Sequence, residues 1–353
     1  MLIKGRKNIV ILITKEGENI MSKQSEKYYA AIDLGTNSCR LVIADENGNY
    51  VYKDTVSTKL GEGMYAQNKL TDEAQERTLE CFYNFKKKID KYNISVNNIR
   101  AIATASCRLA SNGNEFLYKV YHETMIKPDV ISGEEEARLN LVGAMDNVHS
   151  KAKYVLMYDL GGGSTEITLA TRSKNPEIIH TISIPWGARN SSEAFNLKEY
   201  SEDNAALLSK EISRWVDGFK QECNWDRYKD DVCVVATSST PLRLVSMVKD
   251  FGEYDRERAD GVTVKYPSVD KQIESVYNLS AAEMAENRYI GEKRSLIFVA
   301  AGVIFQTISR GLEVKEFTAS LKSAKDGIIK ELINNDKANQ VSPVNQRTSR
   351  DNR

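Results

Sequence analysis

Residues 158–170 read YDLGGGSTEITLA, and this stretch decides how the fold is interpreted. Three consecutive glycines cost backbone entropy at each position, so a structural or chemical requirement must favour them. The stretch follows the apolar residues 154–157 and leads into a run rich in β-branched residues, a pattern of two strands joined by a tight turn. We expect a hairpin whose tip adopts positive φ angles, which glycine reaches without strain, and whose backbone N–H groups stay exposed.

Residues 28–45, YYAAIDLGTNSCRLVIAD, show the same order of strand, Asp-Leu-Gly turn and strand. Each of the two segments is followed by alternating strand and helix patterns. After the first segment the sequence predicts a helix over 71–92, a strand over 99–106, a helix over 114–124, a strand over 127–132 and a helix over 133–148. After the second it predicts a strand over 177–188, a helix over 201–222, a strand over 231–239, a buried helix over 294–312 and a closing segment over 317–334.

The repeat predicts a duplicated α/β fold with a cleft between two domains. We place domain I at 27–148 and domain II at 149–333, each with one glycine turn. Residues 1–26 are interpreted as an N-terminal extension, with translation starting at Met21. The polar tail 334–353 is predicted to be disordered.

Composition narrows the function classes. The chain of 353 residues has 49 Lys+Arg and 49 Asp+Glu, so its overall charge favours neither nucleic acid nor an anionic membrane. Five scattered cysteines without a C-x-x-C motif indicate free thiols in a reducing cytoplasm. Three dispersed histidines disfavour a histidine-rich metal centre, and no apolar run reaches the roughly 20 residues of a membrane span. The sequence does not fix the oligomeric state, and a homodimer is one arrangement open to it.

The two glycine turns suggest a phosphate site. Successive backbone N–H groups in such turns form a nest for phosphate oxygens, and nearby hydroxyls add donors. The predicted phosphate-binding residues of the turns are Gly35, Thr36, Asn37, Ser38, Gly161, Gly162, Gly163, Ser164 and Thr165. Asp33 and Asp159, at the strand ends, are placed to hold Mg²⁺ or Mn²⁺ through its water shell. Two such turns on opposite cleft walls would hold a polyphosphate with a metal ion between them.

Several motifs together resemble one family. They are AIDLGTNSCRLVI (31–43), LGEGM (60–64), ATASCR (103–108), ISGEEEAR (131–138), YDLGGGSTE (158–166) and IPWGA (184–188). Over about residues 28–332 the chain resembles the exopolyphosphatase/guanosine pentaphosphate phosphohydrolase (Ppx/GppA) family, within the actin, heat-shock-chaperone and sugar-kinase superfamily. The resemblance implies two duplicated ribonuclease H-like (actin-like ATPase) domains with an interdomain cleft, in a short form without the helical C-terminal module of long members.

The helix start ISGEEEAR carries three successive glutamates about 100° apart, so they cannot all face one way. Acidic residues there also suit ordinary helix capping. The resemblance implies that Glu135, the first glutamate of the EEAR core, is the general base. It also implies that Glu166 organises metal or water near the second turn. Arg108, after a buried strand, is a candidate to bind phosphate oxygens in bidentate fashion, and Arg40 is a weaker candidate for the far end of a phosphate channel.

The predicted function is a Mg²⁺-dependent phosphohydrolase. It would release terminal phosphate from inorganic polyphosphate or the 5′-phosphate of guanosine pentaphosphate. A phosphotransferase using the same cleft, and a nucleotide- or alarmone-binding regulator without turnover, remain alternatives. Three departures from the family pattern bear on them: Ser238 and Ser239 in place of glycines, Leu296 in place of an acid, and Lys325-Asp326 in place of Arg-Glu.

Overall fold

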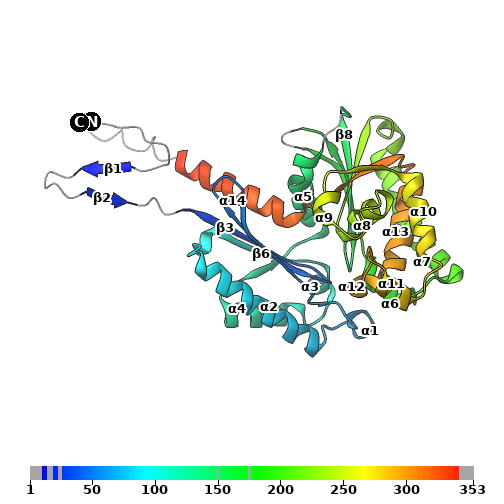
Figure 1. Ribbon diagram of the computed structural model, residues 1–353, viewed down its shortest axis with the longest axis horizontal. Coiled ribbons are helices and arrows are strands. Elements are labelled where there is room, and N and C mark those ends of the chain that lie inside the picture. The colour runs from blue at the N-terminus through cyan, green and yellow to red at the C-terminus, as the bar shows by residue number, and fades with distance from the viewer. Residues whose placement is uncertain (1–9, 14–18, 23–25, 149–150, 174–175, 342–353) are drawn as a thin grey trace, which may run out of the picture.

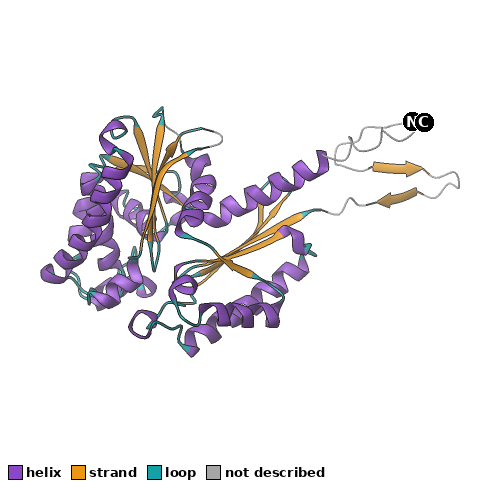
Figure 2. Cartoon of the chain, turned by 180° about the vertical axis from the view of Figure 1, so that it is seen from behind, coloured by secondary structure: helices purple, strands orange, loops and turns teal. Residues whose placement is uncertain are grey.

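The computed structural model describes residues 10–13, 19–22, 26–148, 151–173 and 176–341 of the chain (Figure 1). Two β-sheets are each flanked by helices (Figure 2). The predicted α/β class with two duplicated domains is therefore confirmed. A separate hairpin of β1 (Val10–Ile13) and β2 (Asn19–Ser22) pairs, within the described ranges, with neither sheet.

The first sheet consists of β3 (Tyr28–Leu34), β4 (Cys39–Asp45), β5 (Tyr50–Val56), β6 (Ile99–Ala103) and β7 (Pro128–Val130). Its strand order is β5-β4-β3-β6-β7. The first three strands form an antiparallel meander, because each follows the last through a short turn. β6 and β7 add parallel to β3 after helical crossovers.

The second sheet repeats this topology. It consists of β8 (Tyr154–Leu160), β9 (Thr165–Thr171), β10 (Ile178–Ile184), β11 (Val232–Thr237), β12 (Thr263–Lys265) and β13 (Glu316–Ser320). The order is β10-β9-β8-β11-β13-β12. β8, β9 and β10 form the antiparallel meander, β11 and β13 continue parallel to β8, and β12 is an added antiparallel edge strand.

The helices include those predicted over 71–92, 114–124, 133–148, 201–222 and 294–312, together with others that were not predicted from the sequence. In chain order, the helices are α1 (Met64–Gln67), α2 (Asp72–Lys91), α3 (Ala105–Leu109), α4 (Gly113–Thr124), α5 (Gly133–Ala144), α6 (Ala188–Ala194), α7 (Glu202–Cys223), α8 (Ser239–Val248), α9 (Arg256–Ala259), α10 (Tyr266–Val276), α11 (Ala281–Glu286), α12 (Glu292–Ser295), α13 (Phe298–Gly311) and α14 (Ala324–Val341). The Thr71 hydroxyl accepts from the N–H of Ala74 and so caps α2 as predicted. α13 is buried along almost its whole length, which confirms the predicted buried helix.

The strand β3 shows how the first domain is layered. Ala30, Ile32 and Leu34 contribute to a core that includes residues of α2 and α4. The alternate residues Tyr29 and Ala31 belong to a second core on the opposite face, which includes apolar residues of α14. Both faces are buried because strand side chains alternate, so apolar residues at every position must be covered from two sides.

The helices α5 and α14 connect the two domains. α5 follows β7 of the first sheet, yet its Leu141 and Ala144 pack against Val155 and Met157 of the second sheet. α14 follows β13 of the second sheet and crosses back onto the first, beside α5 (Figure 1). The predicted boundary at 148 lies between the two sheets and the one at 333 lies inside α14, and each connecting helix packs on the other sheet.

The structure changes the interpretation of the C-terminal segment. α14 continues to Val341, so residues 334–341 are helical and the prediction of disorder is wrong for them. The rest of the predicted tail, 342–353, lies outside the described residues, as do residues 1–9 of the N-terminal extension. In the part of the chain that the structure describes, no helix combines the length and apolar character needed to span a membrane.

We predict that the crossing of α5 and α14 does not tolerate a methyl group at Gly327. A Cβ there would lie 2.2 Å from the carbonyl oxygen of Leu139 on α5, so the two helices would have to move apart. Gly327→Ala should lower the free energy of unfolding by about 1–3 kcal/mol. Gly218 in α7 has nothing within 4 Å of the same position, so Gly218→Ala should raise it by about 0.5–1 kcal/mol. Urea denaturation followed by circular dichroism measures both. Equal stability of Gly327→Ala and the parent would contradict the close crossing.

Candidate active site

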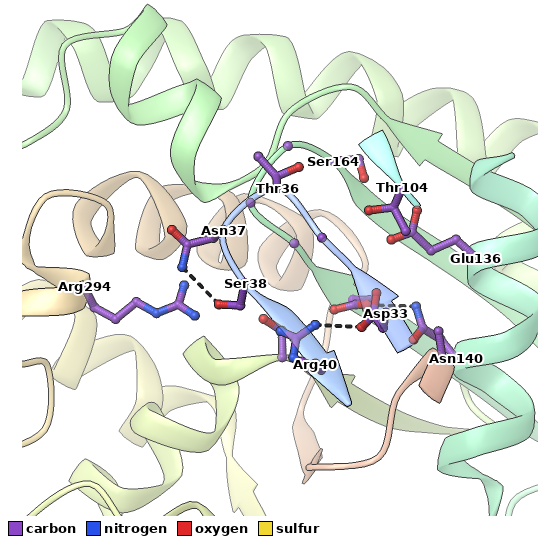
Figure 3. Close-up of a pocket in the computed structure, with 17 residues that line it drawn as sticks. Asp33, Thr36, Asn37, Ser38, Arg40, Thr104, Glu136, Asn140, Ser164 and Arg294 are labelled. Atoms are coloured by element: carbon purple, nitrogen blue, oxygen red, sulfur yellow. Dashed lines mark hydrogen bonds and ion pairs between the residues drawn. The ribbon is translucent and has the colours of Figure 1, made fainter. Parts of the chain in front are cut away.

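The hairpin turns of the two sheets meet at one small pocket between the domains (Figure 3). Ten of the residues predicted from the sequence line it: Asp33, Gly35, Thr36, Asn37, Ser38, Asp159, Gly161, Gly162, Gly163 and Ser164. The cavity of about 50 Å³ has room for a few water molecules or one small anion. The structure thus brings together two segments that lie more than a hundred residues apart in the sequence.

The glycines are required for a reason other than the predicted one. None of Gly35, Gly161, Gly162 and Gly163 has a positive φ angle, so that expectation was wrong. Instead, the turns press against each other. A Cβ at Gly163 would lie 2.6 Å from the hydroxyl of Thr36, and one at Gly162 would lie 3.1 Å from the Cβ of Thr36. The side chain of Thr36 packs directly on the backbone of these glycines and leaves too little space for a Cβ on either of them.

Backbone hydrogen bonds hold each turn in shape. Gly35 N–H donates to the carbonyl of Ser38 at 3.1 Å, and Gly161 N–H donates to that of Ser164 at 3.0 Å. The first turn is further fixed from outside, because the N–H of Gly61 donates to the carbonyl of Thr36 at 2.9 Å. These bonds occupy one donor in each turn and set the orientation of the remaining N–H groups before any ligand binds.

Strand register places a charged pair at the base of each turn. In the first sheet Asp33 lies opposite Arg40, and their side chains form an ion pair of 2.8 Å. In the second sheet Asp159 lies opposite Glu166, so two acids face each other at the equivalent positions. Like charges directly opposite one another destabilise a sheet, and an acid pair that persists there suggests a bound cation.

Glu136 on α5 faces the pocket from the side opposite Arg294 (Figure 3). Its Oε2 lies 3.7 Å from Nη1 of Arg108 and is buried without a hydrogen-bond partner among the described residues. Burial, together with the carboxylates of Glu166 and Asp159, raises the pKa of Glu136 well above its usual range. A carboxylate with these properties is a strong proton acceptor once it is ionised.

Glu135, the predicted general base, does not line the pocket, whereas the adjacent Glu136 does. Its carboxylate accepts from Nε of Arg138 at 2.7 Å and from Nη2 of Arg100 at 3.0 Å. The hydrogen bond from Arg138 lowers the pKa of Glu135, and Arg100 acts in the same direction. Partial burial raises this pKa but does not outweigh the two arginines. The hydroxyl of Ser132 also accepts from the N–H of Glu135, which fixes this residue at the third position of the helix. Successive helical residues point about 100° apart, so Glu136 takes the position inside the pocket.

Three buried oxygens near the two turns have no hydrogen-bond partner among the described residues: Glu136 Oε2, Glu166 Oε2 and Asn140 Oδ1. Burial and the neighbouring Asp159 raise the pKa of Glu166 to about 7. Burial, partly offset by Arg40 and reinforced by Asp33, raises the pKa of Asp159 to about 6. Excess negative charge and unsatisfied oxygen ligands fit a hard divalent cation.

The acids alone do not form a complete metal site. Over the described ranges, no three or more His, Cys, Asp or Glu side chains are grouped so that they could hold an ion by themselves. Mg²⁺ is usually bound through one or two carboxylates, with waters and substrate phosphates as the other ligands. The residues present fit a cation of that kind.

Other predicted residues lie outside the pocket lining. The Thr165 hydroxyl donates to the carbonyl of Trp186 at 2.7 Å and does not line the pocket, so its predicted contact with phosphate stays a prediction. Arg108 donates to the carbonyl of Ile131 at 2.7 Å and lies beside Glu136. Glu166 is buried behind Asp159, and its Oε1 accepts from the hydroxyl of Ser183 at 2.8 Å. The predicted metal and catalytic roles of Glu166 remain predictions.

Sequence reasoning missed Asn140, Thr104 and the pocket position of Arg294. Asn140 lies four residues after Glu136 on α5, and its Nδ2 donates to Oδ2 of Asp159 at 2.8 Å. Helical residues four apart share a face, so this spacing could have identified both residues. Arg294 is on α12, far along the sequence from both turns, and no local pattern indicated its position.

Ser238 stands in place of a glycine of the family pattern, yet its backbone has a conformation typical of glycine. Ser238, just before α8, has φ +92° and ψ 178°, a region that essentially only glycine populates. The turn conformation is therefore retained although the side chain is a serine. At the third departure Asp326 is buried, and the hydroxyl of Tyr50 on β5 donates to it, which links the two domains.

We predict that Ser238→Gly stabilises the protein. Glycine adopts the observed backbone angles without strain, so the free energy of unfolding should rise by about 1–3 kcal/mol. The same urea denaturation experiment measures this change. A neutral or destabilising effect would mean that contacts of the Ser238 side chain outweigh the backbone strain.

We also predict that Glu166→Gln stabilises the metal-free protein at high pH. The pKa of Glu166, about 7, exceeds its ordinary 4.5, so the native state holds this proton more tightly than the unfolded chain does. The stability that this group contributes is complete below about pH 4.5 and is lost as pH rises through about 7. Glu166→Gln should therefore raise the free energy of unfolding by about 2–3 kcal/mol at pH 8 and have little effect near pH 5.

Denaturation in chelator at several pH values checks this expectation. Glu135→Gln is the control of opposite sign, because the pKa of Glu135 is lowered. Its stabilising contribution is present above its unfolded pKa and is lost as pH falls through its folded pKa. A pH-independent effect of Glu166→Gln would contradict the raised pKa.

The sequence model of the Ppx/GppA phosphatase family matches residues 41–336. A relative from Fusobacterium nucleatum subsp. nucleatum, named a bifunctional 3-dehydroquinate synthase/phosphatase, is 35% identical over 289 residues. The match covers 73% of this chain and 42% of that protein, so the chain spans less than half the length of this curated relative.

Solved structures share the fold. An exopolyphosphatase-like protein has a TM-score of 0.78 at 23% identity, with 87% of this chain and 99% of that chain covered. A Ppx/GppA family member from Aquifex aeolicus has a TM-score of 0.72 at 23% identity, covering 88% and 98%. An exopolyphosphatase from Cytophaga hutchinsonii has a TM-score of 0.77 at 20% identity, also covering 88% and 98%. At these identities the likeness demonstrates a common fold.

Proposed function

The chain belongs to the Ppx/GppA phosphatase family, and on that premise we propose that it is a phosphohydrolase that cleaves a terminal phosphoanhydride with Glu136 as general base. The substrates are inorganic polyphosphate or guanosine pentaphosphate. The observation that carries the proposal is the Glu136 carboxylate at the pocket between the two glycine turns, whose Oε2 is buried without a hydrogen-bond partner among the described residues.

The turns supply the phosphate site of this proposal. Hydrolysis of a phosphoanhydride mainly requires a positioned water molecule and stabilisation of the negative charge on the transferred phosphoryl group. Gly162, Gly163, Ser38 and Ser164 line the pocket, and the backbone N–H groups of the two glycines and the hydroxyls of the two serines would donate to that group. Arg40 would add a positive charge while it remains paired with Asp33.

Glu136 would orient the attacking water and accept its proton. The raised pKa makes its carboxylate a better base than an exposed glutamate, and its position leaves one oxygen available inside the pocket. Arg108, 3.7 Å from that oxygen, would keep the carboxylate oriented by charge without forming a direct hydrogen bond.

A divalent cation, Mg²⁺ or Mn²⁺, would be held by Asp159 and Glu166 with help from Asn140. It would supply charge neutralisation for the phosphate oxygens. The raised pKa values of Asp159 and Glu166 and the orphaned oxygens support this placement. Asp33 faces Arg40 in the ligand-free arrangement, so it is the less available of the two predicted aspartates.

The experiment compares two adjacent glutamates. Glu136→Gln should lower kcat for phosphate release from inorganic tripolyphosphate by about 10²–10⁴-fold, because the amide cannot accept the proton. Glu135→Gln should stay within about threefold of the parent, since Glu135 faces Arg100 and Arg138 outside the pocket. Released phosphate is measured with saturating Mg²⁺, and circular dichroism confirms that both variants are folded.

The outcomes are distinct. Loss of activity in Glu135→Gln with full activity in Glu136→Gln would return the base to Glu135. Phosphate that appears on an added acceptor alcohol instead of in solution would identify a phosphotransferase. Tight binding of tripolyphosphate without release or transfer would indicate a regulatory binding protein.

A further inference from the structure

A second cavity, which we call the basic chamber, adjoins the pocket on the side of Arg294. Its volume is about 290 Å³, and it shares Ser38, Arg40 and Arg294 with the pocket. Its basic lining residues are Arg40, Arg243, Arg256, Lys293, Arg294 and Lys325, against the single carboxylate of Asp159. A part of the substrate that extends from a phosphate at the glycine turns into the basic chamber would be surrounded mainly by positively charged side chains.

The charges of the chamber are only partly compensated. Arg40 pairs with Asp33, and Lys325 pairs with Asp326. In contrast, no carboxylate of the described chain lies within ion-pair distance of Arg243 or Arg294. Burial and the neighbouring Arg243 and Arg40 lower the pKa of Arg294 to about 9. Clustered cations without anions are unfavourable by themselves, so this arrangement suits an anionic ligand.

Arg243 lies on α8, just after the serines that depart from the family pattern. Its Nη1 donates to the carbonyl of Tyr289, and its Nε is buried without a hydrogen-bond partner. The guanidinium lies 3.8 Å from the ring centroid of Tyr254, so it covers one face of that ring. The side chain is therefore held in place while its Nε–H has no partner among the described residues.

Tyr254 is the single aromatic side chain among the chamber-lining residues that the structure describes. A purine base is usually bound by stacking on an aromatic or apolar face. Here the ring face is occupied by Arg243, and the other apolar lining residues are Leu242 and Leu321. The chamber offers many donors for phosphate oxygens and little surface for a nucleobase.

We infer that Arg243 makes the basic chamber select an unbranched inorganic phosphate chain over guanosine pentaphosphate. The inference rests on the proposed phosphohydrolase function and specifies its substrate. Arg243 acts in two ways: its Nε–H donates to the phosphate chain, and its stacking on Tyr254 withholds that ring from guanine.

The test compares inorganic tripolyphosphate with guanosine pentaphosphate in the full chain. The parent protein should have the higher kcat/KM for tripolyphosphate. Arg243→Gln should lower kcat/KM for tripolyphosphate about 10-fold or more, the effect of losing one charge-assisted hydrogen bond. It should change kcat/KM for guanosine pentaphosphate less, because Tyr254 becomes accessible to the base. Arg243→Lys, which keeps the charge, should lie between the two.

Arg258→Gln is the matched control. The Arg258 guanidinium also stacks on a ring, 4.1 Å from the centroid of Phe251, but Arg258 is exposed and does not line the chamber. This variant should leave both kcat/KM values unchanged. Thermal unfolding verifies that Arg243→Gln and Arg243→Lys are folded, and calorimetric titration with tripolyphosphate measures binding separately from turnover.

Several results would overturn the inference. They are a preference of the parent for guanosine pentaphosphate, an equal loss for both substrates in Arg243→Gln, and no loss for either. The proposed function fails in a different way, with no phosphate released from any substrate. In that case weaker binding of tripolyphosphate by Arg243→Gln than by Arg258→Gln would still support the chamber, and equal binding would reject it.

Discussion

The direct contact between the two glycine turns is the constraint on which the rest of the site depends. Gly162 and Gly163 approach Thr36 so closely that a Cβ on either would overlap with it. Because each turn is the end of a buried hairpin, this contact also fixes the strand ends beside it, including Asp33 and Asp159. The pocket is therefore small, and some of its donors are backbone groups, which cannot change rotamer. Such a site is organised before a phosphate arrives.

Duplication has produced two similar hairpins with different charges. Asp33 and Arg40 in the first sheet correspond in position to Asp159 and Glu166 in the second. The first pair is close to neutral, whereas the second carries excess negative charge. Burial, reinforced by Asp33, raises the pKa of Asp159, and burial, reinforced by Asp159, raises the pKa of Glu166. The basic chamber adjoins the pocket and shares Asp159 with it. A ligand that combines a cation with a phosphate chain matches both regions at once.

The connecting helices explain why the site belongs to neither domain alone. α5 leaves the first sheet and packs on the second, and it carries Glu136 and Asn140 to the pocket. α14 makes the reverse crossing, with Gly327 against Leu139 of α5. Tyr50 and Asp326 add a hydrogen bond between the domains close to this crossing. Any movement of one domain relative to the other would therefore move the carboxylate of Glu136 relative to the turns.

The sequence by itself determined the two hairpins, the order of strands and helices, and the residues of both turns, because these follow from local periodicity and turn chemistry. Tertiary structure decided which way the side chains of a helix face and which distant segments come into contact. The rotation of α5 directed Glu136 into the pocket and Glu135 toward Arg100 and Arg138. Contact between the turns, and not a positive φ angle, accounted for the glycines. Arg294 and Arg243 reached the site from distant helices that no local pattern could connect to it, since side chains separated by such lengths of chain meet only through packing of the whole fold.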